Sequence, residues 1–113
     1  MTHPVVAELL AACPKELREL LECCYLGVGV EPDLFQPEKK CTFIDAYCPE
    51  NVYDEIWEAE DAIDCILRVI DPTAFFIPHQ AEFELEYRLY RGEPIPLELE
   101  AVVARAKEGA TCR

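Results

Sequence analysis

One segment of the chain, Glu50–Ile70, concentrates residue types that bind other molecules through charge and ring contacts. Between Glu50 and Asp64 it holds seven acidic residues and no basic one, and it contains Trp57, the only tryptophan. On a helix that turns 100° per residue, Trp57 and Tyr53 fall on the acidic side, away from the apolar positions. Tryptophan and tyrosine are frequent anchors at protein interfaces, and carboxylates around them select a basic partner. The predicted partner-binding residues are Tyr53, Asp54, Trp57, Glu58, Asp61 and Asp64.

Two other interpretations compete for the same residues. Trp57 is a large apolar side chain, and burial beneath residues 28–49 would leave the surrounding acids merely solvated. The carboxylates could instead bind a metal ion, since acids three residues apart on a helix form magnesium sites in some hydrolases. A metal-dependent nucleotide hydrolase is therefore the alternative function, with these residues as ligands: Glu19, Glu22, Asp61 and Asp64. The same spacing also arises on any solvated helix face, and we predict no metal site.

Other chemistry has little support in the sequence. The seven cysteines lack the two closely spaced pairs of a structural zinc site. The chain contains no serine, and both histidines, His3 and His79, lie beside prolines. The segment Gly27–Gly29 lacks the third glycine, the lysine and the following helix of a phosphate loop, so we interpret it as a cap or turn. We predict no catalytic residue and no cofactor, and a binding protein is favoured over an enzyme.

The elements that must position these residues begin with a helical pattern over Pro4–Leu26. Pro14 should kink this helix or divide it into two, and Gly27 should end it. The following residues, Val28–Pro49, are rich in proline and charge and predict a long loop, with one short strand at Cys41–Tyr47.

The spacing in the second half predicts one long helix over Glu50–Ile70, ending before Pro72. Its apolar row is Val52, Ile56, Ala59, Ile63, Ile66 and Ile70. In Ala81–Leu89 apolar residues alternate with charged ones, which favours a strand over the rival helix. A last helix is predicted over Pro96–Lys107. These elements indicate a small α+β single domain over residues 1–113, mainly helical, with three to four helices and one or two short strands. An all-α fold is the alternative.

The net charge of −13 restricts the partners of such a domain. A field of this sign repels phosphate backbones and anionic membranes, so we expect no direct nucleic-acid binding and no membrane binding. No apolar run is long enough to span a bilayer. The odd number of cysteines and the absence of a secretory pattern in residues 1–12 predict a cytoplasmic protein with most thiols buried as small apolar groups.

These observations lead to three functional hypotheses. The first is a small acidic regulator or inhibitor that binds a protein with a basic surface, such as a transcription regulator or a nucleic-acid-processing enzyme. The second is the hydrolase described above, and the third is an oligomeric structural component. We also expect a homodimer, because of the apolar rows on the first and third helices and because of the apolar run Phe75–Ile77.

Overall fold

A three-stranded sheet is the frame of the fold in the computed structural model, which describes residues 3–107. The strands are β1 (Tyr25–Pro32), β2 (Lys40–Cys48) and β3 (Ala74–Gln80), in the order β1-β2-β3. β1 and β2 form an antiparallel hairpin in which Tyr25 lies opposite Tyr47. β2 and β3 are parallel, and Phe43 lies opposite Phe75. The connection between these parallel strands is helical, as parallel pairing requires a long crossover.

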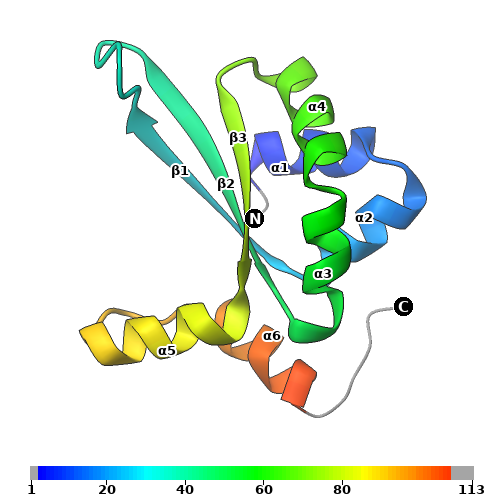
Figure 1. The fold of residues 1–113 in the computed structure, drawn as a ribbon, viewed down its shortest axis with the longest axis vertical. Helices are drawn as coiled ribbons and strands as arrows, with labels where there is room; N and C mark the ends of the chain where they lie inside the picture. The colour runs from blue at the N-terminus through cyan, green and yellow to red at the C-terminus, as the bar shows by residue number, and fades with distance from the viewer. Residues whose placement is uncertain (1–2, 108–113) are drawn as a thin grey trace.

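Six helices pack around this sheet within the described residues. They are α1 (Pro4–Ala12), α2 (Lys15–Glu22), α3 (Glu50–Glu58), α4 (Glu60–Ile70), α5 (Ala81–Arg91) and α6 (Leu97–Lys107). Figure 1 shows α1–α4 together on one side of the sheet, and α5 and α6 near the end where β3 leaves it. The far end of the β1–β2 hairpin extends beyond the helices (Figure 1). This arrangement confirms the predicted α+β class, and the sheet excludes the all-α alternative.

Alternation along the strands directs side chains to two separate clusters. On the face covered by α1–α4, Ile44 and Phe76 pack with buried helix residues such as Leu9, Leu21 and Ile63. On the opposite face, the residues of a smaller cluster beneath α5 and α6 are Tyr47, Ala81, Leu99, Val102 and Val103. The rest of that second face carries Gly27, Gly29, Phe43, Asp45, Phe75 and Ile77. It is therefore covered by helices at one end only.

Several predicted elements are confirmed. Pro14 lies between α1 and α2, which divides the predicted first helix into two. The short strand predicted at Cys41–Tyr47 is part of β2, and the last predicted helix matches α6. Within the predicted apolar row of residues 50–70, Val52, Ile56 and Ile63 are buried and the other three residues are partly buried.

The predicted loop over Val28–Pro49 is wrong in its first part, and so is the helix stop at Gly27. Both Gly27 and Gly29 lie inside β1, opposite Asp45 and Phe43. The loop of the hairpin covers only residues 33–39, where Asp33 accepts hydrogen bonds from the backbone of Phe35 and Gln36. Glycine on its own favours turns over strands, but hydrogen bonding to β2 holds both glycines in an extended conformation. Tertiary pairing therefore overrides the local preference for a turn.

The single helix predicted over Glu50–Ile70 is also wrong, because it is broken at Ala59. Ala59 has φ −92° and ψ 3°, outside the helical region, and its N–H is shared between the carbonyls of Glu55 and Ile56. Alanine is the best helix former, so no local signal marks this break. Both halves nevertheless bury apolar residues in the same cluster, including Ile56 from α3 and Leu67 from α4.

The strand favoured for Ala81–Leu89 is a helix, α5. Its apolar side chains alternate without being buried: Phe83 and Leu89 are exposed, and Ala81 alone is fully buried. Glu84 pairs with Arg88 one turn later, with 2.6 Å between Oε2 and Nε. Gly92 closes the helix with a left-handed conformation at φ 70°. Glutamates and i,i+4 pairs favour the helix, which outweighs the period-two pattern.

Most cysteines within residues 3–107 are buried, as predicted, and Cys65 is exposed. Cys112 lies outside the described residues. Within the described part of the chain, the structure has no helix with the length and apolar character needed to cross a membrane.

Candidate protein-binding surface

The structure exposes the tryptophan at the centre of the predicted surface. Trp57 lies on α3 with 57% of its surface accessible, which is inconsistent with a core position. Its ring stacks with that of Tyr53, with 6.4 Å between centroids and 30° between planes. The two residues are one helical turn apart, so α3 itself holds the rings together. Asp54 and Glu58, also on α3, are exposed beside them.

The two predicted residues of α4 differ from each other. Asp61 is exposed to solvent. Asp64 is half-buried, and its Oδ1 accepts a hydrogen bond of 3.0 Å from the backbone N–H of Phe76 in β3. The carboxylate of Asp64 therefore joins α4 to the sheet in addition to contributing negative charge.

A hollow of about 420 Å³ extends this surface from α3 toward α5. Tyr53 forms its side on α3, Phe83 and Tyr87 form the side on α5, and β3 lies between them. Phe83 is 61% exposed and Tyr87 is 51% exposed. The structure thus gathers four partly or fully exposed aromatic rings from two helices that are distant in sequence. Sequence reasoning missed Phe83 and Tyr87, because a strand at residues 81–89 would have placed every second residue, and so all of its apolar side chains, on the buried face. The helical spacing of these two residues, four apart, was the signal that could have identified them.

A polar network lies beneath the hollow. His79, which lines it, has its Nε2 atom 2.9 Å from Oδ1 of Asp45 on the neighbouring strand. The imidazole of His79 also stacks on Tyr47, with 5.0 Å between ring centroids. The guanidinium of Arg88 lies 5.8 Å from the Tyr47 ring centre. These contacts fix the floor of the hollow between β2, β3 and α5.

The surroundings of Tyr47 and Arg88 raise the pKa values of both groups. Burial raises the pKa of the Tyr47 phenol above its usual value, and the carboxylates of Asp45 and Glu84 raise it further. The hydrogen bond that Arg88 donates to the carboxylate of Glu84 raises the pKa of Arg88, so this guanidinium stays charged. A neutral phenol and a fixed cation make the network a rigid support.

The lining of the hollow contains aromatic rings and the carboxylate of Glu84. It contains no serine, threonine or cysteine that His79 could activate as a nucleophile. Aromatic faces near carboxylates instead suit a cationic side chain, which is attracted to the rings and to the charge. Throughout residues 3–107, no cluster of three or more histidine, cysteine or acidic side chains is arranged to hold a metal ion. The carboxylates of the hydrolase alternative are therefore not gathered into one site.

Neither models of protein families, nor curated proteins, nor solved structures give a significant match to this chain.

Proposed function

We propose that this protein is a regulator or inhibitor that binds a basic surface of another protein. Its binding surface comprises four residues of α3 (the partly buried Tyr53 and the exposed Asp54, Trp57 and Glu58), Asp61 of α4, and Phe83 and Tyr87 of α5. We refer to it as the aromatic–acidic surface. Suitable partners are transcription regulators and nucleic-acid-processing enzymes, because their functional surfaces are basic. An acidic surface would occupy a site that otherwise receives phosphates.

The observation that carries this proposal is the exposure of Trp57, whose ring stacks on the partly buried Tyr53. Water around a half-exposed tryptophan is unfavourable, and a partner that covers the ring would remove it. Fixing both rings on one helix also lowers the entropy lost on binding. Tryptophan and tyrosine at such positions commonly contribute most of the affinity.

The negative charge supports recognition at longer range. Asp54 and Glu58 are exposed on the same helix as the rings, Asp61 is exposed at the start of α4, and no basic residue lies between residues 50 and 64. Such a field accelerates encounter with a basic partner and weakens as salt screens it. Charge would therefore determine which partner is met, and the rings would determine how long it stays.

Affinity capture with matched variants tests this proposal. The tagged protein, Trp57→Ala and Tyr90→Ala would each be used to capture partners from a cell extract at low and at high salt. Tyr90 is a suitable control, because it is 89% exposed on α5 but does not line the hollow. We expect the Trp57 variant to lose the salt-sensitive partner that the Tyr90 variant retains. Equal capture by the two variants would place the interface elsewhere.

The hydrolase alternative has its own test. A cation site formed only in the folded state stabilises that state by mass action. The melting temperature would be measured with and without millimolar magnesium or manganese. A rise specific to these ions would favour the hydrolase, whereas an equal response to a monovalent salt of the same ionic strength would not.

A further inference from the structure

The two edges of the sheet differ in their capacity to pair with another strand. At the β3 edge, the outward N–H of Phe76 donates to Asp64, and Pro78 has no N–H. A strand added there would find its central donors occupied or missing. Proteins commonly protect edge strands in this way.

The pairing pattern shows which backbone groups remain available on β1. Successive residues of a strand direct their N–H and C=O groups to opposite sides. The backbone N–H of Phe76 points away from β2, because it donates to Asp64 on α4. The backbone N–H and C=O groups of the neighbouring residues, Phe75 and Ile77, therefore point toward β2. In the parallel register of β2 and β3, these β3 groups hydrogen bond to the alternate residues Thr42, Ile44 and Ala46 of β2. The backbone groups of Phe43, Asp45 and Tyr47 therefore face β1.

It follows that Tyr25, Gly27 and Gly29 of β1 bond to β2, whereas Leu26 and Val28 direct their backbone groups outward. Within residues 3–107, no loop or helix backbone hydrogen bonds to Leu26 or Val28. The β1 edge therefore offers donors and acceptors in pairs, as an incoming strand requires.

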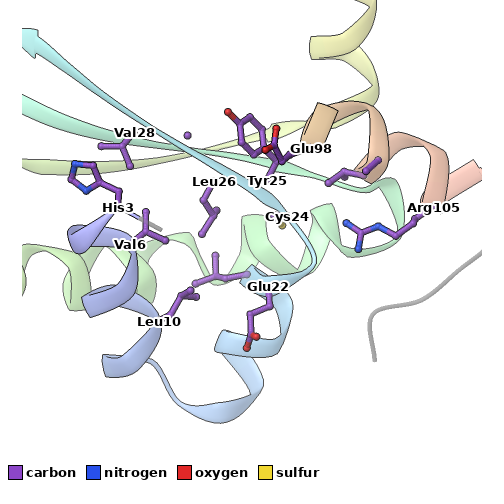
Figure 2. A pocket seen from close by; sticks show the side chains of 14 residues that line it. His3, Val6, Leu10, Glu22, Cys24, Tyr25, Leu26, Val28, Glu98 and Arg105 are labelled. Atoms are coloured by element: carbon purple, nitrogen blue, oxygen red, sulfur yellow. The ribbon is translucent and has the colours of Figure 1, made fainter. Parts of the chain in front are cut away.

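This open edge lies along a groove of about 840 Å³. Figure 2 shows Leu26 and Val28 of β1 near Val6 and Leu10 of α1, with Glu98 and Arg105 of α6 on the other side. The first wall is apolar where Val6, Leu10 and the β1 side chains meet. The second wall includes Gly27, which has no side chain, and Ala101, which has a small one. Side chains of an added strand would alternate between these two walls.

We propose that this groove binds an extended segment of another protein by strand addition to β1. The part of β1 that lines the groove, Tyr25–Val28, extends about 13 Å. Four to six residues of the bound segment would therefore lie in the groove. Its apolar side chains would face Val6 and Leu10, and small polar ones would face Gly27 and Ala101. Main-chain hydrogen bonds to Leu26 and Val28 would supply affinity, and the walls would supply selectivity.

The charge of the groove favours lysine or arginine at the ends of this segment. Glu22 and Glu98 line it from α2 and α6, against Arg105, in a chain of net charge −13. No ion pair within the described residues neutralises Glu22 or Glu98. A second copy of this chain is a poor occupant of the groove, because its own β1, the strand it would have to add, lies between its own α1 and α6.

The direct test is amide hydrogen exchange with a defined probe. The probe is a short peptide of alternating valine and threonine, flanked by lysine pairs. In the free protein, we expect the amides of Leu26 and Val28 to exchange faster than those of Gly27 and Gly29. Saturating peptide should slow the exchange of Leu26 and Val28 by at least about tenfold. A peptide with proline at the central positions should have no effect, because it lacks the donors.

Two pairs of variants separate the groove from the rest of α6. Ala101→Arg fills the groove, whereas Ala104→Arg places the same side chain on an exposed part of α6 that does not line it. We expect the first to weaken peptide binding at least about tenfold and the second less than about twofold. Glu98→Lys should weaken binding of the lysine-flanked peptide, whereas Glu100→Lys should not.

The proposal is overturned by any of three results. The first is fast exchange of Leu26 and Val28 that millimolar peptide leaves unchanged. The second is equal binding by Ala101→Arg and Ala104→Arg. The third is protection of Leu26 and Val28 that rises with protein concentration alone, because the occupant would then be a second copy. None of these results depends on Trp57, so the aromatic–acidic surface is tested independently.

Discussion

At the scale of single residues, Trp57 distinguishes a binding surface from a core. Its ring is 57% exposed, so truncation removes little buried contact. We expect Trp57→Ala to change the free energy of unfolding by less than about 1 kcal/mol and to weaken partner binding by about 2 kcal/mol or more. Urea denaturation and a binding titration measure the two quantities. A loss of about 3–5 kcal/mol in stability would instead indicate a core tryptophan.

The acids around Trp57 contribute differently from the ring. Neutralising Asp54, Glu58 and Asp61 to their amides should slow association and flatten its salt dependence, because steering acts on the encounter rate. Stopped-flow measurements across a salt series give this rate. Asp64→Ala is the informative comparison: it removes the carboxylate that accepts a hydrogen bond from Phe76, so this variant should lose stability while the other three keep it. Equal stability of all four variants would contradict this division.

The thiols provide a third prediction at this scale. Burial raises the pKa of Cys13, which Arg18 only partly offsets, and burial together with the neighbouring Asp33 raises the pKa of Cys41. A raised pKa lowers the thiolate fraction near pH 8, and thiolate is the reactive form. Cys65 is exposed. We expect iodoacetamide to label Cys65 at least about tenfold faster than Cys13 or Cys41 in the native protein. Peptide mapping by mass spectrometry identifies each site, and unfolding should equalise the rates.

At the scale of elements, the sequence predicted helices whose apolar residues are buried, and it missed the strand β1, which forms only by pairing with a distant segment. The apolar row from Val52 to Ile70 identified a helical segment correctly, because each of those residues contacts the core. The break at Ala59 has no local signal, since it depends on how α3 and α4 follow the sheet. β1 was missed because Gly27 and Gly29 mark a turn in isolation and become a strand only opposite β2.

The same distinction explains the incomplete site prediction. Tyr53 and Trp57 were predicted to lie away from the apolar row, and the structure leaves Tyr53 partly exposed and Trp57 exposed. Phe83 and Tyr87 were not predicted as part of the site, because their alternation with charged residues resembles a half-buried strand. Only their position across the hollow from Tyr53 shows that they belong to the same surface.

The turn between α4 and β3 gives a pH-dependent prediction. Hydrogen bonds from the backbone and hydroxyl of Thr73 lower the pKa of Asp71. A lowered folded-state pKa adds stability that is present above the unfolded value of about 3.9 and is lost as pH falls through the folded value. Asp71→Ala should therefore cost about 1 kcal/mol at pH 7 and progressively less below pH 4. Urea denaturation at pH 7, 4 and 3 measures this difference, and a cost independent of pH would contradict the assignment.

At the scale of the whole molecule, the three surfaces lie on different parts of the sheet. The aromatic–acidic surface lies beside β3, the groove lies beside β1, and the uncovered face lies between the two edges. A partner at one edge would leave the other accessible, because the groove and the hollow share no residue. This separation is consistent with a small protein that holds one partner by a helix face and another by its backbone.

The expected homodimer now needs a different surface from the one the sequence suggested. The apolar rows of α1 and α3 are buried in the core of the chain itself, as is Phe76. Phe75 and Ile77, by contrast, are 39% and 37% exposed on the uncovered face. There Phe43 and Phe75 form a ridge, with 5.4 Å between ring centroids, next to a flat strip at Gly29, above which the space is open.

A ridge beside a flat strip is self-complementary under a two-fold axis, since the ridge of each copy can lie on the strip of the other. Sheets packed face to face in this way are about 10 Å apart, close enough to cover these rings. We therefore expect a dimer by light scattering at micromolar concentration, and a monomer for Ile77→Asp with a little-changed fold by circular dichroism. Val69→Asp is the control, because Val69 is 86% exposed on α4, away from that face. A wild-type monomer throughout this range would refute the dimer, and a dimer that survives Ile77→Asp would place it on another surface.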